Sequence, residues 1–204
     1  MLHLTRVNEG LHTSFKNRSW LRSGDVTIYY DDQISLNQAL QSQEIDTQWF
    51  LPFTLYRLQS YTSLREALIN VSLRHIYNEP LITRRLSLTW SADTPVLASP
   101  PVQDAIITEW AACGIACAIL PFYTPLHLVK VTESGDRFDY WVGDGTQLFG
   151  LEVSGILHGP MMQRQQTKVR QLLANPFGIG GYVCIVHFGN QSVDLSFHLP
   201  TGRL

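Results

Sequence analysis

The chain has 204 residues, of which 45% are apolar and 16% are charged, and its formal net charge is −2. This composition excludes a disordered chain, because enough apolar surface can be buried to offset the entropy of ordering one sizeable domain. The small net charge argues against a protein that binds nucleic acid tightly through its overall charge.

The charge is unevenly distributed along the chain. Residues 1–22 and 157–204 are net basic, whereas residues 99–156 carry seven acids against Lys130 and Arg137. An acidic centre between basic ends would suit a metal site flanked by surfaces that contact phosphate. The alternative is a set of solvated faces whose charges are distributed by chance.

Neither the N-terminal segment nor the most apolar run of the chain predicts a membrane protein. The N-terminal segment MLHLTRVNEGLHTSF lacks the apolar central region that a signal peptide needs. The most apolar run, residues 105–120, is too short to span a bilayer and contains Glu109, which favours a buried amphipathic helix.

The three cysteines are too few for a disulfide framework and predict reduced core thiols: Cys113, Cys117 and Cys184. We therefore expect a cytoplasmic protein without membrane association.

Residues 1–98 predict a smaller α+β region of unassigned role. The expected elements are a strand at 25–30 (DVTIYY), a helix from Ser35 to about Gln41, a helix after residue 63, and a strand at 84–90 (RRLSLTW).

The second of these helices is predicted from a capping box. Ser63 and Glu66 have the spacing of such a box before LREALINVSLRHIY. Within that segment Leu64, Leu68 and Val71 share one helical stripe, which predicts that they face the core.

A Ser- and Pro-rich stretch at 91–101 predicts a boundary, and residues 99–204 form the more regular part. Its expected elements are a helix capped by Ser99 with Pro100 at its first position, strands at 127–131, 137–142 and 148–156, a helix from 161, and strands at 181–188 and 193–199. The order α-β-β-β-α-β-β predicts an α+β fold with an α/β-like core and a mixed sheet.

The candidate chemistry is concentrated in YWVGDGTQLFGLEVSGI, residues 140–156. Asp144 lies in a Gly-Asp-Gly turn, where Asp-Gly is also a favoured hairpin sequence. Glu152 lies inside an apolar strand, where an unpaired buried carboxylate would cost several kcal/mol unless the strand is at an edge. Four histidines in the same half offer a rival acid–base chemistry, although their spacing matches no metal or triad motif: His127, His158, His187 and His198.

The element order and the positions of the acids resemble the PD-(D/E)XK nuclease superfamily over roughly residues 99–199. That family has a helix, a three-stranded meander, a crossover helix and a further strand, with an Asp ending the second strand and Glu-x-Lys in the third. The resemblance implies that Asp144 and Glu152 are ligands of Mg²⁺ or Mn²⁺ and that Glu109 is a supporting acid. Asp139 is the substitute for Asp144 if the strand register differs.

The sequence departs from the family motif at Ser154, which stands where the lysine of Glu-x-Lys is expected. A lysine there stabilises the attacking hydroxide and the transition state through charge-assisted hydrogen bonds, which a serine cannot do. Some members recruit the lysine from the following helix, and Lys168 is the candidate for this role.

Three hypotheses follow. The first is a Mg²⁺-dependent nuclease, or a nuclease-like subunit, that hydrolyses phosphodiester bonds in DNA or RNA. The second is a catalytically inactive nuclease-like scaffold that acts as a structural or recognition component, with other protein subunits or as a homodimer. The third is an unrelated α+β interaction domain whose hairpin imitates the motif.

Overall fold

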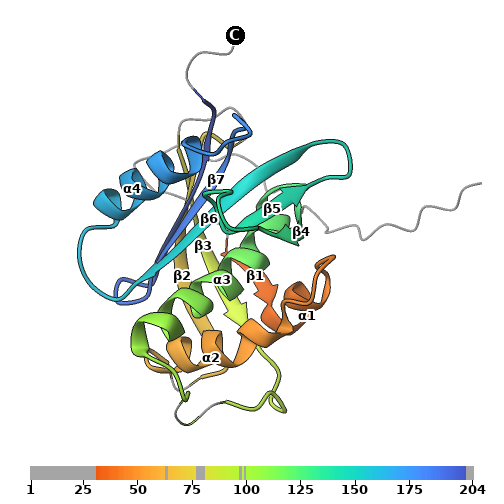
Figure 1. Cartoon of the computed structure of the whole chain (residues 1–204). Helices are drawn as coiled ribbons and strands as arrows, with labels where there is room; N and C mark the ends of the chain where they lie inside the picture. The colour runs from red at the N-terminus through yellow and green to blue at the C-terminus, as the bar shows by residue number, and fades with distance from the viewer. Residues whose placement is uncertain (1–30, 63, 77–80, 97, 99, 201–204) are drawn as a thin grey trace, which may run out of the picture.

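One mixed eight-stranded sheet organises the fold, in the order β1-β3-β2-β8-β7-β6-β5-β4 (Figure 1). The computed structural model describes residues 31–62, 64–76, 81–96, 98 and 100–200. The elements are β1 (Asp31–Ser35), α1 (Leu36–Gln41), the 3-10 helix η1 (Gln48–Phe50), α2 (Leu51–Gln59), β2 (Glu66–Arg74), β3 (Ile82–Thr89), α3 (Asp104–Tyr123), β4 (His127–Val131), β5 (Tyr140–Gly143), β6 (Leu148–Ile156), α4 (Met161–Leu173), β7 (Gly181–His187) and β8 (Ser192–His198). The fold class is α+β, as predicted.

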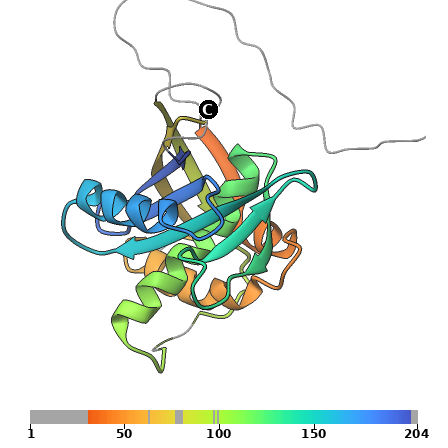
Figure 2. The ribbon, with the colours of Figure 1, turned by 45° about the horizontal axis from the view of Figure 1, so that its top comes forward.

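The helices cover the two faces of the sheet unequally. α3, with α1 and α2, packs on one face, and α4 lies on the other (Figure 1, Figure 2). Two glycines of β6 mark these faces: a Cβ on Gly155 would meet Thr108 of α3, whereas one on Gly150 would meet Leu172 of α4. The main hydrophobic core therefore lies between the sheet and α1–α3, and a smaller cluster lies under α4.

Helix α3 is the central helix of the core. It has the length and hydropathy of a membrane span, yet 67% of its most apolar window is buried within the fold. Residues 111–120 are buried without exception, between the sheet on one side and α1 and α2 on the other. The predicted amphipathic pattern is therefore wrong over this stretch, because both sides of the helix are covered.

The residues before and after the predicted boundary at 98–99 contribute to the same sheet. β2 pairs in parallel with β8, from Asn70 opposite Ser192 to Arg74 opposite Ser196. Side chains from both stretches also belong to one core cluster. The connection between β3 and α3 thus joins two parts of a continuous sheet.

The helix predicted after residue 63 is wrong, because this segment forms strand β2. Ala67, Ile69, Val71 and Leu73 are buried, and the residues between them are more exposed, which is the period of a strand. Leu68, predicted to face the core, is 42% exposed. Pairing with β3 and β8 outweighs the local capping pattern.

The predicted capping residues Ser63 and Ser99 and the strand predicted at 25–30 lie outside the described residues. Two other element starts differ for backbone reasons. α3 begins at Asp104 rather than Pro100, because Pro101 disfavours the helical conformation of the residue before it. β5 begins at Tyr140 rather than Arg137, whose φ of 67° is incompatible with a strand. The remaining predicted helices and strands are confirmed within one or two residues.

The alternation along β2 predicts how two adjacent substitutions differ. Ile69→Ala should lower the free energy of unfolding by about 2–5 kcal/mol, because it leaves a cavity in the core. Leu68→Ala, on the exposed face, should change it by about 0.5 kcal/mol or less. Chemical denaturation of both variants measures the difference, and a larger loss for Leu68→Ala would contradict the strand assignment.

Candidate active site

Strand β6 extends beyond its neighbour β5 and so has an open edge. β5 pairs with β6 only from Leu148 to Leu151, whereas β7 pairs with β6 as far as Ile156. Within the part of the chain that is described, no strand pairs with residues 152–156 on the β5 side. Backbone N–H groups on this edge, those of Val153 and Gly155, need other acceptors.

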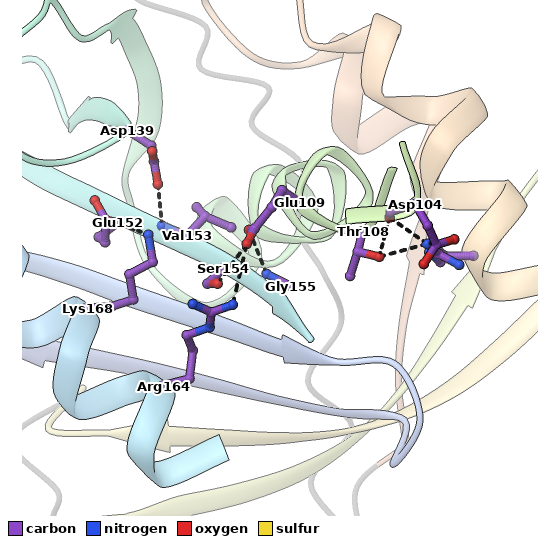
Figure 3. A network of polar contacts seen from close by, with 11 residues as sticks. Asp104, Thr108, Glu109, Asp139, Glu152, Val153, Ser154, Gly155, Arg164 and Lys168 are labelled. Atoms are coloured by element: carbon purple, nitrogen blue, oxygen red, sulfur yellow. Dashed lines mark hydrogen bonds and ion pairs between the residues drawn. The ribbon is translucent and has the colours of Figure 1, made fainter. Parts of the chain in front are cut away.

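Two carboxylates supply these acceptors (Figure 3). An oxygen of Asp139 accepts the N–H of Val153 at 2.7 Å. The two oxygens of Glu109 accept the N–H of Gly155 at 2.9 Å and the hydroxyl of Ser154 at 3.1 Å. Acids from two separate elements are thus held at one strand edge.

Asp139 reaches this edge because it lies directly before β5. Its own N–H donates to the carbonyl of Leu151 at 2.9 Å, which continues the hairpin by one residue. The preceding Phe138 is buried in the cluster under α4. Burial raises the pKa of the Asp139 carboxyl, while the hydrogen bond from Val153 acts against that rise.

Glu109 reaches the edge because α3 packs unusually close to β6. A Cβ on Gly155 would lie 2.3 Å from the carbonyl oxygen of Thr108, so a glycine is needed where the helix crosses the strand. The first turn of α3 is anchored to α2 by Arg57, whose guanidinium donates to the Asp104 carbonyl and the Thr108 hydroxyl at 2.8 and 2.7 Å. Glu109 follows this anchored turn.

Glu152 is the buried acid of the site. Its side chain is 0% exposed, and its Oε1 forms an ion pair with the ammonium group of Lys168 from α4. Its other oxygen, Oε2, is buried and has no hydrogen-bond partner among the residues that the structure describes. Burial raises the pKa of Glu152 to about 7; the charge of Asp139 adds to the rise, and Lys168 opposes it.

Arg164 brings a second cation to the site. It lies one turn before Lys168 on α4, and its Nη2 is 4.0 Å from Oε1 of Glu109. Its side chain is 43% exposed, so it is accessible to a ligand. The sequence analysis did not identify Arg164, although its i, i+4 spacing from Lys168 would have indicated a shared helix face.

The structure brings together Glu109, Glu152 and Lys168 of the predicted site, with Ser154 beside them. Asp144 is placed elsewhere, as an exposed turn residue. One of its oxygens accepts the N–H groups of Thr146 and Gln147 and the Thr146 hydroxyl, and these bonds lower the pKa of Asp144 to about 2.

Hairpin geometry explains this correction. Asp144 follows Gly143, which is opposite Leu148, four residues and about 13 Å along the strand from Glu152. Asp139 precedes Tyr140, which is opposite Leu151, and so lies next to Glu152. Asp139, the predicted substitute, therefore occupies the position expected of Asp144.

The donor set of this edge is compatible with a hard divalent cation. Among the described residues, no group of three or more His, Cys, Asp or Glu side chains is arranged to hold a metal ion. Mg²⁺, however, commonly takes only one or two carboxylates and retains several waters. The unpartnered Oε2 of Glu152 and the second oxygen of Asp139 are available for such binding.

Comparisons with protein-family models, with curated proteins and with solved structures find no match to this chain. The geometry at the open edge of β6 is therefore the basis for a functional assignment.

Removing Lys168 should expose the cost of burying Glu152. Lys168→Met should lower the free energy of unfolding at pH 8 by about 3–5 kcal/mol, because the carboxylate loses its partner. Glu152→Gln combined with Lys168→Met should recover much of this loss in chemical denaturation. Lys130→Met, which breaks the exposed Lys130–Glu133 pair, is the matched control and should leave stability unchanged.

The raised pKa of Glu152 predicts a pH dependence of stability. The folded protein binds this proton more tightly than the unfolded chain, whose ordinary pKa is 4.5. The stabilisation is therefore complete below about 4.5 and is lost as pH rises through about 7. Over this range, the free energy of unfolding of the wild type should fall relative to that of Glu152→Gln, and parallel pH profiles would contradict the assignment.

Proposed function

We propose that this chain is a Mg²⁺- or Mn²⁺-dependent nuclease that hydrolyses phosphodiester bonds, built on a PD-(D/E)XK-like core. The element order supports this proposal. β4, β5 and β6 form an antiparallel meander, α4 crosses over, and β7 pairs in parallel with β6. α3 precedes the meander and packs on it, as the first helix of that family does.

The observation that carries the proposal is the environment of Glu152. A buried carboxylate with one oxygen paired to Lys168 and the other unpartnered is costly in a purely structural role. The same group, next to Asp139 at an open strand edge, is suited to binding a cation. Lys168 then occupies the place of the lysine that the motif lacks at Ser154.

Each side chain has a role in this mechanism. Asp139 and Glu152 would hold the cation, and the chemistry it would supply is a lowered pKa of an attacking water and screening of charge on the phosphate. Lys168 donates charge-assisted hydrogen bonds to the oxygens that gain negative charge. Arg164 contacts a phosphate oxygen, and Glu109 fixes the backbone edge that positions Ser154 and Gly155.

A second candidate is a catalytically inactive scaffold within a larger assembly or a homodimer. It is favoured by one observation: Asp139 and Glu109 already accept the N–H groups of the open edge, and Lys168 already neutralises the charge of Glu152, without a cation. For either candidate we propose a cytoplasmic setting, since all three cysteines are buried and unpaired.

Nuclease assays separate the two candidates. Plasmid and single-stranded substrates should be cleaved in Mg²⁺ or Mn²⁺ but not in EDTA. Asp139→Asn and Glu152→Gln should each lower the rate by about 100-fold or more, because each removes a cation ligand. Asp144→Asn, which alters only the turn, is the control and should retain the wild-type rate.

Two results would overturn the nuclease proposal. One is the absence of metal-dependent cleavage on both substrates. The other is cleavage that Glu152→Gln leaves unchanged while the variant remains folded by circular dichroism, since a contaminating enzyme would then be responsible.

A further inference from the structure

A pair of aromatic rings, one exposed and one partly buried, lies on the α4 side of the sheet. Phe177, in the loop after α4, is 46% exposed, and its ring centroid is 4.9 Å from that of Trp141 on β5. Phe138 lies behind both, with its centroid 4.9 Å from that of Trp141. We call Phe177 and Trp141 the aromatic platform.

The platform is rigidly held. Asn175 is buried, and its amide group donates to the carbonyls of Leu172 and Ile179 at 2.7 and 2.9 Å. Its oxygen accepts the N–H of Phe177 at 3.0 Å. The indole N–H of Trp141 donates to Asp136 at 3.2 Å. The loop therefore holds Phe177 in an exposed position with little conformational freedom left to lose on binding.

The platform lies beside the candidate active site. Trp141 is opposite Gly150, and Gly150 and Glu152 are on the same face of β6, about 7 Å apart along the strand. Phe138, which supports the platform, is adjacent in sequence to Asp139.

The segment that contains α4 is positively charged, which suits binding of a phosphate backbone. Residues 157–180, from the end of β6 to the start of β7, contain no Asp or Glu. They contain three cations on α4: Arg164, Lys168 and Arg170. Arg164 and Lys168 face Glu109 and Glu152, whereas Arg170 lies in the last turn of α4, shortly before Phe177. A polyanion that approaches along α4 therefore meets positive charge, while Asp136 is the acid that contacts Trp141.

We propose that the aromatic platform stacks an unpaired base, so that single-stranded nucleic acid, rather than duplex, is the substrate class of this chain. The cleavage of that substrate rests on the proposed function, whereas its binding does not. Cationic grooves with aromatic rings are the common means of holding single strands, because every base has a face that can stack. In a duplex those faces are already stacked on neighbouring pairs, and the platform has no access to them.

The test is binding in EDTA, which prevents cleavage. Fluorescence anisotropy would follow a labelled mixed-sequence single-stranded DNA and the same sequence as a duplex. Phe177→Leu keeps apolar packing against Trp141 but removes the ring that stacks. We expect it to weaken single-strand binding by roughly 5- to 150-fold, the range given by loss of one stacked base.

Two further variants complete the comparison. Phe177→Trp should retain single-strand binding, because the ring is replaced by a larger one. Phe122→Leu is the matched control, since Phe122 is a similarly exposed aromatic residue (42%) near the end of α3. It should bind as the wild type does.

Equal binding by Phe177→Leu and wild type would overturn the inference, as would tighter binding of the duplex than of the single strand. A separate assay in Mg²⁺ distinguishes the two proposals. Duplex cleavage that Phe177→Leu leaves intact would retain the nuclease function and reject the platform. Single-strand binding that depends on Phe177, without any cleavage, would support the platform and reject the nuclease function.

Discussion

The unpaired edge of strand β6 is the constraint on which the rest of the site depends. In the described part of the chain, the strand beyond Leu151 has a hydrogen-bonded neighbour on one side only, so its amides on the other side need acceptors. Asp139 and Glu109 supply them from the start of β5 and from α3. Satisfying the backbone thus draws two carboxylates to one place, next to the buried Glu152, and concentrates negative charge there.

This concentration of charge in turn determines the position of α4. Glu152 is fully buried, and the ammonium group of Lys168 is its counter-ion. Gln165, on the same helix, donates to Asp194 and Ser196 of β8 at 2.7 and 3.1 Å. α4 is therefore held to the sheet by polar contacts on both sides of a small apolar cluster. A helix held in this way keeps Arg164 and Lys168 facing the open edge.

The sequence was sufficient for much of the C-terminal part. Elements such as β6 and β7 have clear apolar patterns, and Glu152 stands out as a carboxylate inside one of them. The role of Glu109 was predicted from the resemblance to the nuclease superfamily. β2 was mispredicted because its helical stripe and its strand alternation share Val71, and only pairing with β3 and β8 decides between them. Long-range pairing of this kind leaves no local signal.

The site was harder to predict than the fold for a related reason. The choice between Asp139 and Asp144 depends on where β5 begins, which the left-handed backbone of Arg137 determines. The role of Glu109 depends on the contact between Thr108 and Gly155, two residues distant in sequence. Asp144 matched the motif by spacing alone. Its carboxylate accepts the N–H groups of Thr146 and Gln147 and so stabilises the hairpin turn.

We propose above all that the open edge of β6 binds a divalent cation through Asp139 and Glu152. A crystal structure with Mn²⁺, phased on the anomalous signal of the metal, tests it most directly. We expect an anomalous peak within coordination distance of the carboxylates of Asp139 and Glu152. A metal-saturated crystal with no peak at this edge, or with a peak only beside Asp144, would contradict it.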